Sequence, residues 1–162
     1  MSEKLVVGIS DYKKAKGTGM LVTYALGSCV GICLYDKQAK VGGLSHIMLP
    51  DSAMFANVET NRMKFADTAL PDLYAELKAM GANPARLTAK IAGGAQMFQT
   101  SASSKIGQIG ERNVKMVKQV LAALKIPIIA EDTGANYGRT VFFDVADGSV
   151  KIQSLNRIVR EM

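Results

Sequence analysis

The chain has 162 residues, of which 48% are hydrophobic and 21% charged, and it carries a formal net charge of +6. These values are typical of a soluble globular protein, so we expect one domain spanning residues 1–162. The positive charge comes without a zinc-finger spacing, a recognition-helix signature or an aromatic-rich RNA motif, which argues against nucleic-acid binding. It either forms a solvated face or steers the protein towards an acidic surface.

The start of the chain shows no secretory signal, because the apolar run Leu5–Ser10 is short and breaks at Asp11. The stretch from Gly17 to Tyr35 is uncharged, but its glycines and hydroxyl residues favour two strands joined at Gly27-Ser28 over a membrane helix. Cysteines that cannot pair locally, in a chain without a targeting segment, indicate a reducing compartment. We therefore expect a cytoplasmic protein without membrane insertion.

Taken in chain order, the pattern predicts a first strand over Leu5–Ser10, a polar loop over Asp11–Gly19 and a second strand over Leu21–Ala25. Thr23 lies in the second strand. Its hydroxyl either hydrogen-bonds a histidine or belongs to an ordinary β-favouring residue.

The next two apolar runs, Cys29–Tyr35 and Lys40–Met48, are separated by a polar break over Asp36–Ala39, which predicts a hairpin. A loop of two or four residues centred on this break sets Cys29 directly opposite His46, with both side chains on one face. Loops of three or five residues would place them on opposite faces. The four-residue loop is favoured, because a two-residue turn requires residue types other than Lys and Gln.

His46 is the only histidine of the chain, and Cys29 and Cys33 are its only cysteines. An imidazole beside a thiol can activate it as a nucleophile. Cys29 is the better candidate because it follows the Gly27-Ser28 turn, whereas Cys33 lies mid-strand and is typical of a small packing residue. Within one strand their Cα atoms are about 13 Å apart, too far for a disulfide. From these residues alone, both cysteines and the histidine could equally be packing residues.

After Pro50, the segment Asp51–Thr60 is polar and predicts a loop. Arg62–Met80 predicts a helix, because apolar residues recur at three- and four-residue steps. Pro71 either kinks this helix or starts a second segment near Ala69, and Gly81 is a candidate C-cap.

The second half of the chain predicts a strand over Leu87–Ala92 and a helix over Glu111–Lys125. The stretch between them is rich in small and polar residues without periodicity, and we expect it to shape a substrate groove. Further strands are predicted over Pro127–Ala130, Thr140–Asp144 and Val150–Leu155. Because strands come in adjacent runs, the expected fold class is α+β, with layered mixed or antiparallel sheets and two main helices.

Five segments occur in a characteristic order: ALGSCV, GGLSHIMLPDS, AGGAQMF, IGERN and DTGANYGR. Together they resemble the CheD family of chemoreceptor glutamine deamidases over nearly the whole chain. The resemblance implies a cysteine hydrolase with Cys29 as nucleophile, His46 as base and Thr23 as a third catalytic residue. One departure is visible: Gly134-Ala135 stands where related sequences usually carry paired glycines.

The resemblance further implies helices packed outside layered sheets, similar to the deamidase domain of the cytotoxic necrotizing factors. The implied partners are the cytoplasmic helices of methyl-accepting chemotaxis receptors and a CheC-type phosphatase. In the implied reaction, a Cys29 thioester forms on a receptor glutamine and water releases glutamate. We expect the oxyanion to be bound by the N–H of Cys29 and another at Gly27-Ser28.

Two other readings remain open at this point. The chain could be chiefly a binding module for receptors and the phosphatase, and methylesterase action on methylated glutamate would use the same residues. No cofactor is expected, and a single histidine without clustered ligands predicts no metal site.

Overall fold

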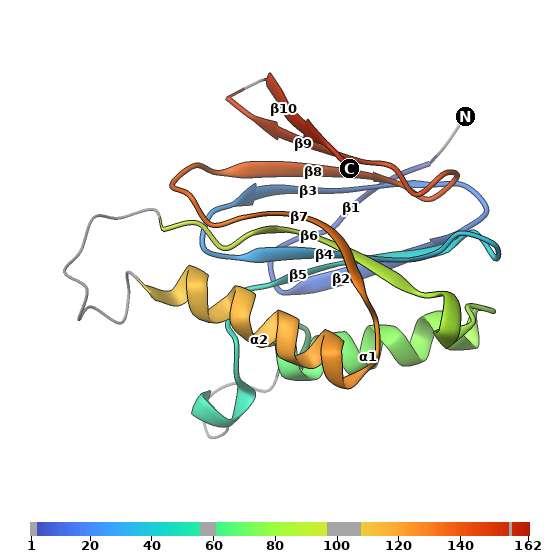
Figure 1. Cartoon of the computed structure of the whole chain (residues 1–162), viewed down its shortest axis with the longest axis horizontal. Coiled ribbons are helices and arrows are strands. Elements are labelled where there is room, and N and C mark those ends of the chain that lie inside the picture. Colours follow the sequence, from blue (N-terminus) through green and yellow to red (C-terminus); the bar gives the residue numbers. More distant parts are fainter. Residues whose placement is uncertain (1–2, 56–60, 97–107, 156) are drawn as a thin grey trace.

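The computed structural model describes residues 3–55, 61–96, 108–155 and 157–162. Within these ranges the chain forms two five-stranded sheets and two α-helices, arranged as three layers (Figure 1). Most of the long polar stretch expected to shape a groove falls at 97–107, outside the described residues. None of the described helices is long and apolar enough to cross a membrane.

The first sheet has the strand order β1-β3-β8-β9-β10 and the second the order β2-β5-β4-β6-β7. Only β1–β3 and β6–β7 are parallel pairs among the described strands. The expected α+β class with mixed sheets is therefore confirmed, while the likeness to the toxin domain stays a prediction. The strands are β1 Lys4–Val6, β2 Asp11–Lys16, β3 Met20–Leu26, β4 Val30–Asp36, β5 Val41–Ile47, β6 Thr88–Gly93, β7 Ile128–Thr133, β8 Arg139–Asp144, β9 Val150–Ser154 and β10 Arg157–Glu161.

Helices α1 (Ala66–Ala79) and α2 (Ile109–Ala123) cover the outer face of the second sheet (Figure 1). Alternation along the strands divides the buried side chains between two cores. One core lies between the second sheet and the helices and includes Ile32, Leu73 and Val117. The other lies between the two sheets and includes Leu21 and Phe143.

Helix α1 runs continuously through Pro71, so a second segment starting near Ala69 does not exist. A 3₁₀ turn over Arg62–Lys64 precedes it, which shortens the helix expected from Arg62. Gly81 follows the last turn with φ of +110°, which confirms it as the residue that ends the helix in a left-handed conformation.

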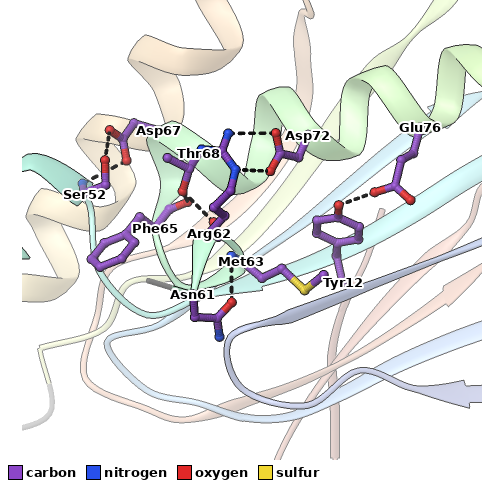
Figure 2. A network of polar contacts seen from close by, with 10 residues as sticks. All are labelled: Tyr12, Ser52, Asn61, Arg62, Met63, Phe65, Asp67, Thr68, Asp72 and Glu76. Carbon is purple, nitrogen blue, oxygen red and sulfur yellow. Dashed lines mark hydrogen bonds and ion pairs between the residues drawn. The ribbon is translucent and has the colours of Figure 1, made fainter. Parts of the chain in front are cut away.

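The segment Asp11–Lys16 was expected to be a loop and is instead the edge strand β2. Charged residues are common on edge strands, because they prevent pairing with other chains. Two side chains of β2 also find partners on α1: Tyr12 donates a hydrogen bond to Glu76 (Figure 2), and Lys14 Nζ lies 2.7 Å from the same carboxylate.

The segment that leaves β5 is fastened to α1 at two points (Figure 2). Ser52 donates from its hydroxyl and its N–H to Asp67, at 2.8 and 3.0 Å. Arg62 forms a bidentate ion pair with Asp72, at 2.8 and 2.9 Å. These contacts fix the path of the chain directly after the strand that carries His46.

The β4–β5 hairpin has a different register from the expected one: His46 lies opposite Gly31, and Cys29 precedes the strand. The loop is Lys37–Lys40, because Asp36 still pairs as a strand residue while its carboxylate accepts two N–H groups of the loop. The expectation that Cys29 directly opposes His46 is therefore wrong. Cys29 nevertheless packs against the core between the two sheets, the side of the second sheet on which His46 meets Thr23.

Candidate active site

His46 lies in the middle layer of the molecule, on a strand with neighbours on both sides. Its backbone pairs with Asp11 of β2 and Gly31 of β4, and its side chain is fully buried. Gly31, its partner on β4, has no side chain, so residues of the first sheet approach the second sheet closely beside His46. A Cβ atom at that position would lie 3.1 Å from a methyl of Leu26 and 3.7 Å from the methyl of Thr23.

Thr23 reaches His46 from the first sheet. Its Oγ1 lies 2.7 Å from His46 Nδ1 and donates a hydrogen bond of 2.8 Å to the backbone oxygen of Val7. A hydroxyl has one proton, so the oxygen that donates to Val7 must accept from Nδ1. The arrangement therefore places the proton of the neutral imidazole on Nδ1 and leaves a lone pair on Nε2.

The Nε2 atom of His46 is buried and has no hydrogen-bond partner within the described part of the chain. Burial lowers the pKa of His46 to about 4, because the protonated ring would lose its hydration. At neutral pH the ring is uncharged and holds its lone pair ready, which is the form that a general base requires.

Cys29 lies directly before β4 and is half-buried. Burial raises the pKa of its thiol, and the residue's own backbone N–H offsets part of that rise. The raised pKa of Cys29 and the lowered pKa of His46 both favour the uncharged group. The resting pair is therefore a thiol and an imidazole rather than a thiolate and an imidazolium.

The relative placement of Cys29 and His46 follows from the hairpin. Cys29 lies in the bend directly before the first ladder pair, Val30 and Ile47, and packs against the core between the sheets, on the side where Thr23 meets His46. No hydrogen bond joins the two side chains in the residues that the structure covers.

The turn at Gly27-Ser28 is held by the segment after β6. Ala95 N–H donates to the oxygen of Gly27 at 2.9 Å, and Gly94 N–H donates to the oxygen of Cys29 at 2.8 Å. Gly93 has φ of +112°, and a Cβ atom there would lie 2.3 Å from the Cys29 oxygen. Only glycine fits at this close approach.

Asn113 completes this support from α2. Its Nδ2 donates to the oxygen of Ser28 at 2.9 Å and to the oxygen of Met48 at 3.0 Å. From the sequence, a capping or loop-anchoring role and a functional role were equally open for this residue. No local pattern identifies it, because its partners lie in distant parts of the chain.

Arg139 is a second supporting residue that sequence reasoning missed, although it lies in the DTGANYGR segment. Its side chain is buried and forms an ion pair with Asp132 at 3.1 Å. Its guanidinium lies 4.2 Å from the ring centre of Tyr137, and its Nη1 is 3.5 Å from the oxygen of Gly93. It thereby connects β8 to the glycine turn that contacts Cys29.

The Gly134-Ala135 pair adopts a conformation suited to glycines. Both residues have positive φ, +80° for Gly134 and +58° for Ala135. The local turn nevertheless forms, with Gly134 N–H donating to Gly93 at 3.0 Å and Ala135 accepting from Gln96 at 2.9 Å. The departure from the family pattern therefore keeps the turn.

Cys33 has the packing position expected for it. Its side chain is buried between the sheets, and burial raises the pKa of its thiol. It borders a separate cavity of about 280 Å³ with Lys37 and Lys90 in its wall. Among the described residues, no group of three or more potential metal ligands lies close together.

Comparison with known proteins gives a consistent picture. A family model described as CheD chemotactic sensory transduction matches residues 48–154. A protein named probable chemoreceptor glutamine deamidase CheD from Desulforamulus reducens is 53% identical over 94% of this chain and 91% of its own length. Proteins with the same name from Moorella thermoacetica and Caldanaerobacter subterraneus subsp. tengcongensis are each 52% identical, covering 96% and 98% of this chain and 93% and 98% of their own lengths.

Among solved structures, the hypothetical protein YfiH of Bacillus licheniformis aligns with a TM-score of 0.46 at 15% identity. The alignment covers 72% of this chain but only 47% of that one. Similarity at this level carries no argument about the site.

Proposed function

The chain belongs to the CheD family, and from this premise we propose that Cys29, His46 and Thr23 together hydrolyse glutamine side chains of chemoreceptors. The activity is that of a chemoreceptor glutamine deamidase, a protein-glutamine amidohydrolase. The observation that carries the assignment of residues is the buried, unpartnered Nε2 of His46, whose ring Thr23 orients on the face that it shares with Cys29.

The first half of the reaction forms a thioester. His46 Nε2 takes the proton of the Cys29 thiol as the sulfur attacks the side-chain carbonyl carbon of glutamine. Proton transfer accompanies attack because the resting groups are neutral. When the tetrahedral intermediate collapses, the C–N bond breaks, His46 returns the proton to nitrogen, and ammonia leaves.

The second half releases glutamate. His46 Nε2 accepts a proton from water, and the resulting hydroxide attacks the thioester carbon. The C–S bond then breaks, and the sulfur of Cys29 regains its proton. Thr23 keeps Nδ1–H bonded in both halves, so that the same nitrogen of His46 acts as base and acid throughout.

The negative charge on the oxygen of both tetrahedral intermediates requires hydrogen-bond donors already in place. We assign this role to the N–H of Cys29 and to a second N–H of the Gly27-Ser28 turn. The assignment is supported by the two carbonyl oxygens of this turn and that of Cys29, which accept hydrogen bonds from Ala95, Asn113 and Gly94 respectively. A turn held in this way does not reorganise during the reaction.

Mass spectrometry of a receptor cytoplasmic fragment incubated with the protein tests the assignment, since each deamidated glutamine exchanges NH2 for OH. Cys29→Ala should abolish the exchange and keep receptor binding. Cys33→Ala is the matched control, because it removes the other thiol, and should deamidate at the wild-type rate. Normal deamidation by Cys29→Ala would overturn the proposal.

Location and partners follow from the same premise. We infer that the protein works in the cytoplasm, where the modified helices of the receptors lie, and that a CheC-type phosphatase binds it. Family membership is the support for both statements. A binding titration with a purified CheC-type protein, using Cys29→Ala to prevent turnover, measures the second directly; absence of binding would contradict it.

A further inference from the structure

Asn113 connects the two ends of the hairpin that carries the proposed catalytic pair. It is fully buried in α2, and its Nδ2 donates to Ser28, the residue before Cys29, and to Met48, two residues after His46. One side-chain amide therefore sets the distance between the start of β4 and the end of β5.

We propose that Asn113 is a positioning residue that aims the backbone N–H of Cys29 at the oxyanion. This inference rests on the proposed function. The oxygen of Ser28 and the N–H of Cys29 belong to one planar trans peptide unit and point in opposite directions. Because Asn113 holds that oxygen, the N–H of Cys29 is turned away from α2. The thiol lies on that side as well, because Cys29 packs against the core between the two sheets, on the face of the second sheet opposite to α2.

The helix that carries Asn113 is seated directly on the supporting turn. A Cβ atom at Gly110 would lie 2.5 Å from the oxygen of Ala95 and 2.6 Å from that of Gly94. Helix α2 and the Gly94-Ala95 segment therefore approach closely. The N–H groups of that segment donate to the oxygens of Cys29 and Gly27.

Only one of the two polar atoms of the Asn113 side chain has hydrogen-bond partners, which supports a positioning role over a purely stabilising one. Both Nδ2 bonds are made, whereas Oδ1 is buried and lacks a partner within the described ranges. A buried acceptor without a partner opposes folding. An asparagine therefore stands at this position for the two hydrogen bonds that Nδ2 donates, although its Oδ1 has no partner within the described residues.

The test compares Asn113→Ala and Asn113→Asp with the wild-type protein. Alanine removes both donors, and aspartate replaces them with an oxygen facing two carbonyl oxygens. Val117→Ala is the matched control, because Val117 is equally buried one turn further along α2 and belongs to the apolar core between the helices and the second sheet. For each variant, kcat and KM for receptor deamidation are measured together with the rate of Cys29 alkylation by iodoacetamide.

Alkylation forms no oxyanion, so it separates thiol reactivity from oxyanion stabilisation. We expect kcat to fall by about tenfold to a hundredfold in both Asn113 variants, with KM and the alkylation rate changed by no more than about twofold. Val117→Ala should lower the melting temperature to a similar extent and keep kcat. If Asn113→Asp does not fold, Asn113→Ala still gives the decisive comparison.

Two results would overturn the positioning role: kcat no lower than in Val117→Ala, or loss of alkylation by the same factor as kcat. Cys29→Ala is measured in parallel to distinguish this failure from failure of the proposed function. Deamidation that survives Cys29→Ala overturns the nucleophile and this inference with it. Loss of deamidation in Cys29→Ala with normal kcat in the Asn113 variants overturns this inference alone.

Discussion

Thr23 and His46 belong to different sheets, yet their side chains meet, with Oγ1 2.7 Å from Nδ1. The bond that Thr23 donates to Val7 decides which ring nitrogen carries the proton. A backbone oxygen just beyond β1 therefore selects the tautomer of a side chain in the other sheet. This relationship yields the first prediction.

Replacing Thr23 by valine should lower kcat for deamidation by about tenfold to a hundredfold, a smaller loss than removal of a charged orienting group causes. Valine keeps the shape but leaves the Nδ1–H of His46 buried without an acceptor, so the ring is free to rotate or change tautomer. Thr23→Ser keeps the hydroxyl and should retain most of the activity. Equal kcat in the valine and serine variants would contradict the orienting role.

His46 should titrate far below the usual range, with a pKa of about 4, because its ring is withdrawn from water. The chain has a single histidine, so its NMR signals identify it without assignment. Ring resonances recorded between acidic and neutral pH measure this pKa directly. A midpoint at the ordinary value of about 6.5 would contradict the lowered pKa, and one well above neutral pH would indicate a thiolate–imidazolium pair in the resting protein.

Much of the site was predictable because strand alternation is a local property. The runs around the hairpin placed Cys29 and His46 on one face, and Leu21–Ala25 was correctly predicted as a strand containing Thr23. The register was not predictable from apolar residues alone. It depends on the side chain of Asp36, which keeps that residue in the strand while bonding the loop.

The missed features share a physical cause, which is that their sequences carry no local signal. β2 and β10 are edge strands; all five residues of β10 are exposed, so no apolar alternation marks it. Asn113 and Arg139 act on backbone oxygens far away in the sequence. Such contacts depend on how the layers pack, and that is set by both cores together.

The depressed pKa of His46 also predicts how stability depends on pH. Between about pH 6.5 and the folded pKa of about 4, the unfolded state binds the proton that the folded state excludes. Stability should therefore fall as pH falls through this window, by up to roughly 3 kcal/mol. Urea unfolding at several pH values measures the slope, and His46→Gln should remove this part of it. An unchanged slope in the variant would contradict the prediction.

Asp36 should matter for stability in a lower pH window. Burial opposes its ionisation, but the Arg86 guanidinium and the N–H groups of Asn83 and Ala39 outweigh it, and its pKa is lowered to about 2. The stabilisation of the fold by ionised Asp36 is present above the unfolded pKa of about 3.8 and is lost as pH falls towards 2.

At pH 7, Asp36→Asn should lower the free energy of unfolding by about 2 kcal/mol, because Arg86 loses its charged partner. The loss is limited because the Arg86 side chain is partly exposed to water. Denaturant unfolding measures the cost, and Asp72→Asn, which removes a more exposed ion pair, is the control and should cost about 1 kcal/mol or less. Equal costs for the two variants would contradict the structural role of Asp36.

Gly93 and Gly134 allow a paired test of whether the turn behind Cys29 sets the activity. Both have positive φ, so alanine strains the backbone at either position, by about 1 kcal/mol. At Gly134 a Cβ atom would meet nothing within 4 Å, whereas at Gly93 it would lie 2.3 Å from the Cys29 oxygen. Gly134→Ala should therefore lose stability and keep kcat. Gly93→Ala must push the Cys29 peptide aside, and its kcat should fall by about a hundredfold or more. Parallel measurement of melting temperature and deamidation separates the two effects, and equal kcat in both variants would show that the position of Cys29 tolerates the displacement.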